Sequence, residues 1–219
     1  MLFQQIRSIS TGAYSYLLGN RDHKTALVID PITDNLDVLL ALIGDQTLDL
    51  SFILLTHAYP DAESSATALR SRAGGSIVTS SACKMTAVDW HVDHDDHLAF
   101  GEDVIHVIAT PGHTPCSVCY RWRDRLFTGD TLLAGDCGDV EQPKADASAL
   151  FDSVTNRLFV LPPETLVFPG HDAVGRTVST IAEEKAINPR FKGHSRDTFA
   201  MLMSETSPSS PTQPRMSTT

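Results

Sequence analysis

Short apolar runs separated by turn-forming residues predict a series of strands along the chain. The first of them, residues 14–18 (YSYLL), is rich in β-forming side chains and is followed by a turn-like segment, GNRDHK. Residues 50–55 (LSFILL) are almost wholly apolar, which is typical of a strand that is covered on both faces. The remaining predicted strands lie within residues 25–30, 75–80, 97–101, 103–110, 116–122, 125–130 and 165–171, and several end before the last residues of these segments.

Apolar side chains recur at helical spacing in other segments. Gly44 suits the end of the first of these helices, and Asn188-Pro189 would stop the last one. The predicted helices cover residues 35–44, 62–73, 147–160 and 176–187. Strands that alternate with helices favour an α/β fold with two β-rich halves, each followed by helices. We predict a single domain over residues 1–203, and a disordered tail over residues 204–219, which are rich in Ser, Thr and Pro.

Composition narrows the class of protein without indicating a function. The 219 residues are 42% hydrophobic and 20% charged, which is ordinary for a globular domain with a sizeable core. A net charge of −10 and the lack of a Lys/Arg cluster argue against nucleic acid or anionic membranes as partners. No apolar run approaches the roughly 20 residues that span a bilayer, and the N-terminus lacks a signal-peptide pattern, so that we expect a cytoplasmic protein.

Four of the predicted strands are each followed at once by a residue whose side chain can bind a metal. They are His57 after FILLT, His113 in ATPGH, Asp130 in FTGD and His171 in FPGH. Strand ends at one edge of a sheet can meet in space although they lie far apart in the sequence. A single histidine after a strand is more often a surface residue, whereas these positions together favour a metal site.

Two other motifs have simpler interpretations. Cys116 and Cys119 have CxxC spacing, but no second CxxC completes a zinc site, and the alternation of SVCYRW puts them on opposite faces of a strand. We therefore expect the cysteines to be small buried residues in a reducing compartment. His91, His94 and His97 are interspersed with aspartates, and we interpret this segment as a solvated loop, with adventitious metal binding as the alternative.

The motifs around the metal-competent positions resemble those of the metallo-β-lactamase fold family. The loop THAYPDA, residues 56–62, stands where the family has THxHxDH, and TPGHTP, FTGDTLL and PGHD match its later metal motifs. Within the family, YSYLLG, ALVIDP, FTGDTLLAGDCG and STIAEEKAINPRF look like the persulfide dioxygenases of the glyoxalase II branch. The resemblance runs from about Leu2 to Met203 and implies an α/β fold, an αβ/βα four-layer sandwich with the metal at the edge of the sheets.

The same resemblance, applied residue by residue, implies which metal chemistry the chain retains. The hydrolases of the family bind two metal ions, of which one would lose a ligand here at Tyr59 and the other at Ala62. The persulfide dioxygenases hold one ferrous ion at positions that correspond to His57, His113 and Asp130. Two imidazoles and one carboxylate leave open positions for a thiolate-type substrate and O₂. The resemblance therefore implies one Fe(II) per chain, with Zn as the alternative.

Further residues are expected to act around that ion. Tyr59 either fills the space of the missing histidine, donates a hydrogen bond toward oxygen at the iron, or binds the iron as phenolate, which the usual phenol pKa of about 10 disfavours. Asp61 and His171 would orient water or the iron ligands. Asp139 replaces an arginine that the family uses in its pocket for glutathione persulfide, so that a different sulfur substrate is expected.

Three functions remain open on these grounds. The leading one is a mononuclear non-haem iron dioxygenase that uses O₂ to oxidise the sulfur of a small thiol or persulfide. The second is a glyoxalase II-like thioester hydrolase that uses metal-bound hydroxide. The third is a non-catalytic binding protein of the same fold. The oligomeric state, a homodimer included, is left open by the sequence.

Overall fold

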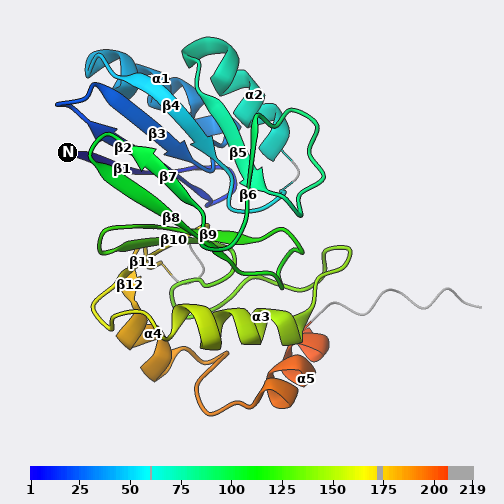
Figure 1. Ribbon diagram of the computed structural model, residues 1–219. Helices are drawn as coiled ribbons and strands as arrows, with labels where there is room; N and C mark the ends of the chain where they lie inside the picture. The colour runs from blue at the N-terminus through cyan, green and yellow to red at the C-terminus, as the bar shows by residue number, and fades with distance from the viewer. Residues whose placement is uncertain (60, 172–174, 207–219) are drawn as a thin grey trace, which may run out of the picture.

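Two six-stranded sheets form the centre of the protein in the computed structural model, which describes residues 1–59, 61–171 and 175–206 (Figure 1). The first sheet has the strand order β1-β2-β3-β4-β5-β6, and the second has the order β12-β11-β10-β9-β8-β7. Figure 1 shows α1 and α2 outside the first sheet, and α3, α4 and α5 outside the second. The layers are therefore helix, sheet, sheet and helix, and the expected α/β four-layer sandwich is confirmed.

The elements alternate along the chain as the apolar pattern predicts. The strands are β1 (Leu2–Arg7), β2 (Tyr14–Asn20), β3 (Thr25–Ile29), β4 (Asp49–Leu54), β5 (Ser76–Ser80), β6 (Trp90–Val92), β7 (His97–Phe100), β8 (Asp103–Ala109), β9 (Val118–Trp122), β10 (Arg125–Gly129), β11 (Leu166–Pro169) and β12 (Ser179–Thr180). The helices are the 3₁₀ turn Thr33–Asn35, α1 (Leu36–Asp45), α2 (Ala62–Ala73), α3 (Ala147–Ser153) with a π-helical continuation Val154–Leu158, α4 (Ile181–Ile187) and α5 (Arg196–Thr206).

Three hydrophobic clusters hold the layers together. Between the sheets, Tyr16 packs against Phe127 and Phe168, with ring centroids 5.0 and 5.9 Å away. A second cluster contains side chains of the first sheet and of α1 and α2, and a third contains side chains of the second sheet and of α3, α4 and α5. The apolar runs therefore contribute buried side chains on both faces of each sheet. Each fully buried Leu, Ile or Phe stabilises the fold by roughly 1.5–3 kcal/mol.

Backbone hydrogen bonds connect the two sheets at the edge where the metal-competent residues lie. The amide of Val118, at the start of β9, donates to the carbonyl of Thr56 just after β4, at 2.7 Å. The amide of Tyr14, at the start of β2, donates to the carbonyl of Gly170 just after β11, at 2.8 Å. These bonds fix the loops that follow β4 and β11 against the opposite sheet.

Several boundaries differ from the sequence-based expectation. The predicted helix 176–187 begins only at Ile181, because residues 179 and 180 form strand β12 against β11. The predicted helix 147–160 changes to a π-helix at Val154. Helix α5 has no counterpart among the predicted helices, and it runs to Thr206, past the predicted domain boundary at residue 203. The rest of the predicted tail, residues 207–219, lies outside the described residues. None of the helices in the described parts is long and apolar enough to cross a membrane.

Candidate metal centre

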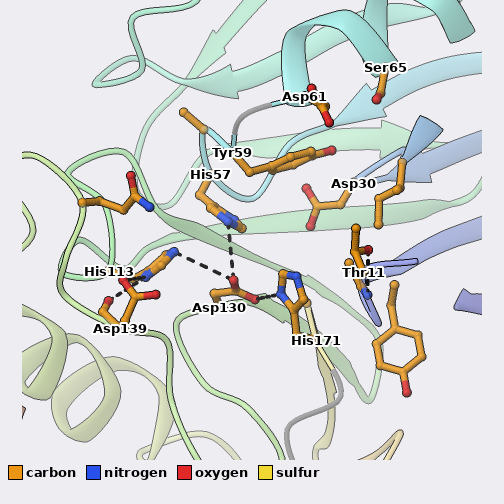
Figure 2. A pocket seen from close by; sticks show the side chains of 16 residues that line it. Thr11, Asp30, His57, Tyr59, Asp61, Ser65, His113, Asp130, Asp139 and His171 are labelled. Atoms are coloured by element: carbon orange, nitrogen blue, oxygen red, sulfur yellow. Dashed lines mark hydrogen bonds and ion pairs between the residues drawn. The ribbon is translucent and has the colours of Figure 1, made fainter. Parts of the chain in front are cut away.

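The metal-competent residues that follow separate strands meet in one cavity of about 280 Å³ (Figure 2). His57 follows β4, His113 lies between β8 and β9, Asp130 follows β10 and His171 follows β11. All of them line the cavity, together with Tyr59 and the other residues that Figure 2 draws. The strand ends are thus brought together as the sequence predicts.

Two imidazole nitrogens and one carboxylate oxygen face each other in this cavity. Nε2 of His57 lies 3.8 Å and Nε2 of His113 lies 3.9 Å from Oδ2 of Asp130. The donor atoms of the three residues all lie within 4.8 Å of one another, and both histidines are only 5% exposed. Two metal–nitrogen or metal–oxygen bonds of about 2.1 Å can span up to about 4.2 Å, so the two measured separations fit ligands of one ion. We name these residues the His57–His113–Asp130 triad.

A chain of hydrogen bonds orients His57. Thr56 donates its amide to Oδ1 of Asp30 at 2.8 Å and its hydroxyl to Oδ2 of the same carboxylate at 2.7 Å. The Thr56 oxygen also lies 2.9 Å from Nδ1 of His57, and because its proton points at Asp30, it must accept from His57. Nδ1 of His57 therefore carries a proton, and the lone pair of Nε2 is free for a metal.

Burial acts in opposite directions on the pKa values at the two ends of this chain of hydrogen bonds. It lowers the pKa of His57 to about 4, so that the ring is neutral near pH 7, as a metal ligand requires. Burial also raises the pKa of Asp30 to about 7, against the opposing effect of the hydrogen bonds from Thr56. Asp30 and Thr56 were not among the expected site residues, although ALVIDP and LLTH both contain a polar residue directly after an apolar run.

His113 and Asp130 are oriented by partners of their own. Nδ1 of His113 donates to the backbone carbonyl of Asp139 at 2.7 Å, which again leaves Nε2 free. Nδ1 of His171 lies 2.7 Å from Oδ1 of Asp130, so His171 binds one carboxylate oxygen and leaves the other to the triad. Burial alone would raise the pKa of Asp130, but this hydrogen bond and the neighbouring imidazoles lower it to about 2. The carboxylate is therefore an anion over the whole physiological range.

The loop between Asp130 and Asp139 is tied to α4 and the residues after it. The buried carboxylate of Glu184 accepts from the amide of Gly135 at 3.0 Å and from Nδ2 of Asn188 at 2.7 Å. Arg190 donates from Nε to Asp136 at 2.6 Å. These contacts give the motif AEEKAINPRF a structural role. It holds the loop that begins at Asp130, a triad residue, and ends at Asp139, whose carbonyl orients His113.

Tyr59 and Asp61 lie beside the triad in different ways. The Tyr59 hydroxyl donates to the carbonyl of Pro31 at 2.8 Å, and its ring packs against His57 with centroids 5.4 Å apart. Burial raises the pKa of Tyr59 well above 10, which disfavours a phenolate. Asp61 is exposed at the start of α2 and lines the cavity. Within the described ranges, the candidate metal cluster consists of the triad alone.

The remaining motifs lie outside this centre. Cys116 faces Cys83, with the two sulfurs 2.9 Å apart, whereas the sulfur of Cys119 lies 3.4 Å from the hydroxyl oxygen of Thr110. The cysteines are free and buried, in agreement with the expectation. His97 stacks edge-on against His106 at 4.5 Å, and the segment from His91 to His97 belongs to β6, a turn and the start of β7 rather than to a loop alone.

The role of Asp30 is tested by Asp30→Asn. The amide nitrogen of asparagine would donate to the Thr56 hydroxyl, whose proton would then point at Nδ1 of His57 and push the ring proton to Nε2, the atom that faces the metal. We expect metal affinity to fall by about 10–100-fold. A competition titration with a chromophoric chelator measures this fall. Asp34→Asn is the control, because Asp34 is an exposed carboxylate that also accepts from hydroxyls, namely those of Ser8 and Ser10. Equal affinity of both variants would contradict the proposed proton arrangement.

Comparisons with known proteins agree with this geometry. The family model of the metallo-beta-lactamase superfamily matches residues 84–171. Persulfide dioxygenase ETHE1, mitochondrial, of Bos taurus is 34% identical over 193 residues, which cover 87% of this chain and 76% of that protein. The crystal structure of ETHE1 from Myxococcus xanthus has a TM-score of 0.89 and 40% identity, and the match covers 96% of this chain and 93% of that one.

A hydrolase is also among the similar proteins. The probable polyketide biosynthesis zinc-dependent hydrolase BaeB of Bacillus velezensis is 32% identical over 167 residues, which cover 72% of this chain and 72% of that protein. One similar protein is thus named a dioxygenase and another a zinc-dependent hydrolase, so the comparisons alone agree with more than one chemistry. Fold, motifs and similarity together show that the chain belongs to the metallo-β-lactamase superfamily, as an enzyme similar to the persulfide dioxygenases.

Proposed function

We propose that this enzyme is a mononuclear non-haem iron dioxygenase that oxidises the sulfur of a small persulfide or thiol. The observation that carries the proposal is the His57–His113–Asp130 triad, in which two Nε2 atoms and one Oδ2 atom face a single point in the cavity. Two histidines and one carboxylate are the ligand set of non-haem Fe(II) oxygenases, which need open positions for two reactants. A ferrous ion held there would bind the sulfur and O₂ next to each other and supply electrons to O₂.

For a persulfide, the proposed reaction balances with one water molecule. The outer sulfur gains both atoms of O₂ and one oxygen from water, and the sulfur–sulfur bond breaks. The inner sulfur takes up one proton and leaves as a thiol, and sulfite and two protons are the other products. The outer sulfur is oxidised and O₂ is reduced, so no further reductant is needed. The chain contributes a neutral imidazole at His57, the free Nε2 atom of His113 and an anion at Asp130. His57 and His113 are both buried.

The other predicted site residues act around the ion without binding it. His171 orients Asp130 through their 2.7 Å hydrogen bond, and we propose that it is not itself an iron ligand. Asp61 lines the cavity and is available to position water or substrate. Tyr59, with its hydroxyl bound to Pro31, fills the position of a lost ligand and supports the His57 ring. This supports the space-filling interpretation of Tyr59 over ligation.

A thioester hydrolase is the second candidate, favoured by the similarity to a zinc-dependent hydrolase and by the presence of Asp61 and His171 in the same cavity. A second metal ion in the family's two-metal pattern would also need a ligand where this chain has Ala62, whose methyl side chain offers none. The one-ion chemistry is therefore the better supported of the two.

Metal analysis combined with O₂ uptake tests the proposal. Protein produced with iron and zinc both available should contain close to one iron per chain, and O₂ uptake with a small persulfide should disappear on chelation and return with Fe(II) but not with Zn(II). The matched measurement is thioester cleavage under anaerobic conditions, which should be absent. Two zinc ions per chain together with O₂-independent thioester cleavage would show that the protein is a hydrolase and not a dioxygenase.

A further inference from the structure

The cavity around the triad is lined by acidic side chains. Asp30, Asp61, Asp130 and Asp139 all line it, and no Lys or Arg side chain is found among the lining residues that the structure describes. The chain as a whole carries a net charge of −10, so its overall field adds to the local one. A substrate that enters this cavity meets a negative potential.

Two of these carboxylates are already engaged inside the site. Asp130 belongs to the triad and accepts from His171, and Asp30 uses both of its oxygens to accept from Thr56. A metal ion bound by the triad would also offset the charge of Asp130. Neither residue is therefore free to pair with a charged group on the substrate.

Asp61 and Asp139 are different, because both are exposed at the mouth of the cavity. In Figure 2 they lie on opposite sides of the triad, Asp61 at the start of α2 and Asp139 beside His113. The side chain of Asp139 is 55% exposed. Its Oδ1 accepts from the amide of Glu141 at 3.1 Å and lies 3.9 Å from Nδ1 of His113. Both carboxylates can thus reach a substrate group that stays near the mouth while the sulfur enters.

His171 lines the cavity, and its hydrogen bond to Asp130 raises its pKa. At 2.7 Å, any charge on this imidazole pairs with the Asp130 carboxylate rather than with Asp61 or Asp139.

Two arginines near the mouth are likewise paired with other carboxylates. Arg190 forms an ion pair with Asp136 at 2.6 Å, and Arg176 forms one with Glu183, also at 2.6 Å. Lys144 is exposed and is not one of the lining residues. A carboxylate on the substrate would therefore meet like charges without a compensating partner, whereas an ammonium group would meet opposite ones.

We propose that the cavity selects a compact sulfur substrate that carries an amine, with Asp61 and Asp139 as the charge-selecting residues. The proposal rests on the proposed function, because it assumes that the sulfur lies at the triad. A volume of about 280 Å³ is at the small end of ligand cavities, which favours a short aminothiol persulfide over a carboxylate-rich peptide.

Binding of three small thiols to the iron-loaded protein tests the charge preference without requiring turnover. Cysteamine, 2-mercaptoethanol and 3-mercaptopropionate have similar lengths and end in an ammonium, a hydroxyl and a carboxylate. In anaerobic calorimetry at low ionic strength, cysteamine should bind at least about tenfold more tightly than 3-mercaptopropionate, with 2-mercaptoethanol between them. The difference should shrink as salt is added. Equal affinities, or a preference for the carboxylate, would overturn the proposal.

Charge variants identify the residues responsible. Asp139→Asn and Asp61→Asn should each reduce the preference for cysteamine several-fold, and Asp139→Asn keeps an oxygen that can accept from the Glu141 amide. Asp45→Asn is the matched control, because Asp45 is exposed at the end of α1, outside the cavity, and its replacement changes the net charge equally. If Asp45→Asn reduced the preference as much as the cavity variants, the preference would come from the net charge of the protein and not from Asp61 and Asp139.

The persulfides of the same thiols separate this inference from the proposed function. If the binding order holds but no persulfide supports O₂ uptake, the charge selection stands and the dioxygenase function fails. If all three are oxidised with equal kcat/KM, the dioxygenase function stands and the charge selection fails. The result that supports both is the highest kcat/KM for cysteamine persulfide, lowered by Asp139→Asn.

Discussion

Replacing His113 by alanine is expected to leave a folded protein that no longer binds iron and no longer consumes O₂. The change removes one of the two Nε2 atoms that face Asp130, so a single imidazole and a carboxylate would remain to hold the ion. It also removes the donor to the half-buried Asp139 carbonyl. Leaving an acceptor unpaired costs about 1–3 kcal/mol when it is fully buried, so the cost here is at most of that order. That is small beside the roughly 5–15 kcal/mol stability of a typical domain, so the fold should persist.

Iron per chain, O₂ uptake and circular dichroism distinguish this expectation from unfolding. Iron content should fall from near one to near zero, and O₂ uptake should fall by more than the roughly 10–100-fold that loss of an orienting partner causes. His94→Ala is the control, because His94 is an exposed histidine outside the triad, and it should retain both. A folded His113→Ala protein with a full complement of iron would refute the triad as the binding site.

The residues of the candidate site could be picked out from the sequence because each follows an apolar run that becomes a strand. β4 ends at Leu54 and β10 at Gly129, shortly before His57 and Asp130, so the change from apolar to polar residues marks the edge of the sheets. Helix α2 also has the predicted bounds, residues 62–73. These features depend on local pattern, which the sequence contains in full.

Features that depend on pairing in space could not be predicted. Strand β1 has two adjacent glutamines, Gln4 and Gln5, which interrupt the alternation, and it forms because its whole length pairs with β2. In the same way, the sequence reveals a missing histidine at Tyr59, but the bond from its hydroxyl to Pro31 depends on how the loop folds back over the end of β3. The direction of the protons between Asp30 and His57 requires the contacts themselves.

A single added methyl group, in Gly138→Ala, is expected to disrupt the metal centre as severely as the loss of a ligand. A Cβ at this position would lie 2.4 Å from the carbonyl oxygen of Asp130 and 2.8 Å from Nδ1 of His113. Gly138 also donates its amide to that carbonyl at 2.7 Å, so the backbone cannot move away without losing the bond. The strain acts on two triad residues at once, and it displaces Asp139, whose carbonyl orients His113.

We therefore expect Gly138→Ala to weaken iron binding by at least about 100-fold, beyond the usual effect of losing one orienting partner, and to destabilise the fold by about 1–3 kcal/mol through overpacking. Gly44→Ala is the matched control, because a Cβ at Gly44 of α1 would have no atom within 4 Å. That variant should keep its iron affinity and gain about 0.5–1 kcal/mol from helix propensity. Chelator competition and urea unfolding measure both quantities, and wild-type iron affinity in Gly138→Ala would mean that the loop from Asp130 to Asp139 does not orient the triad.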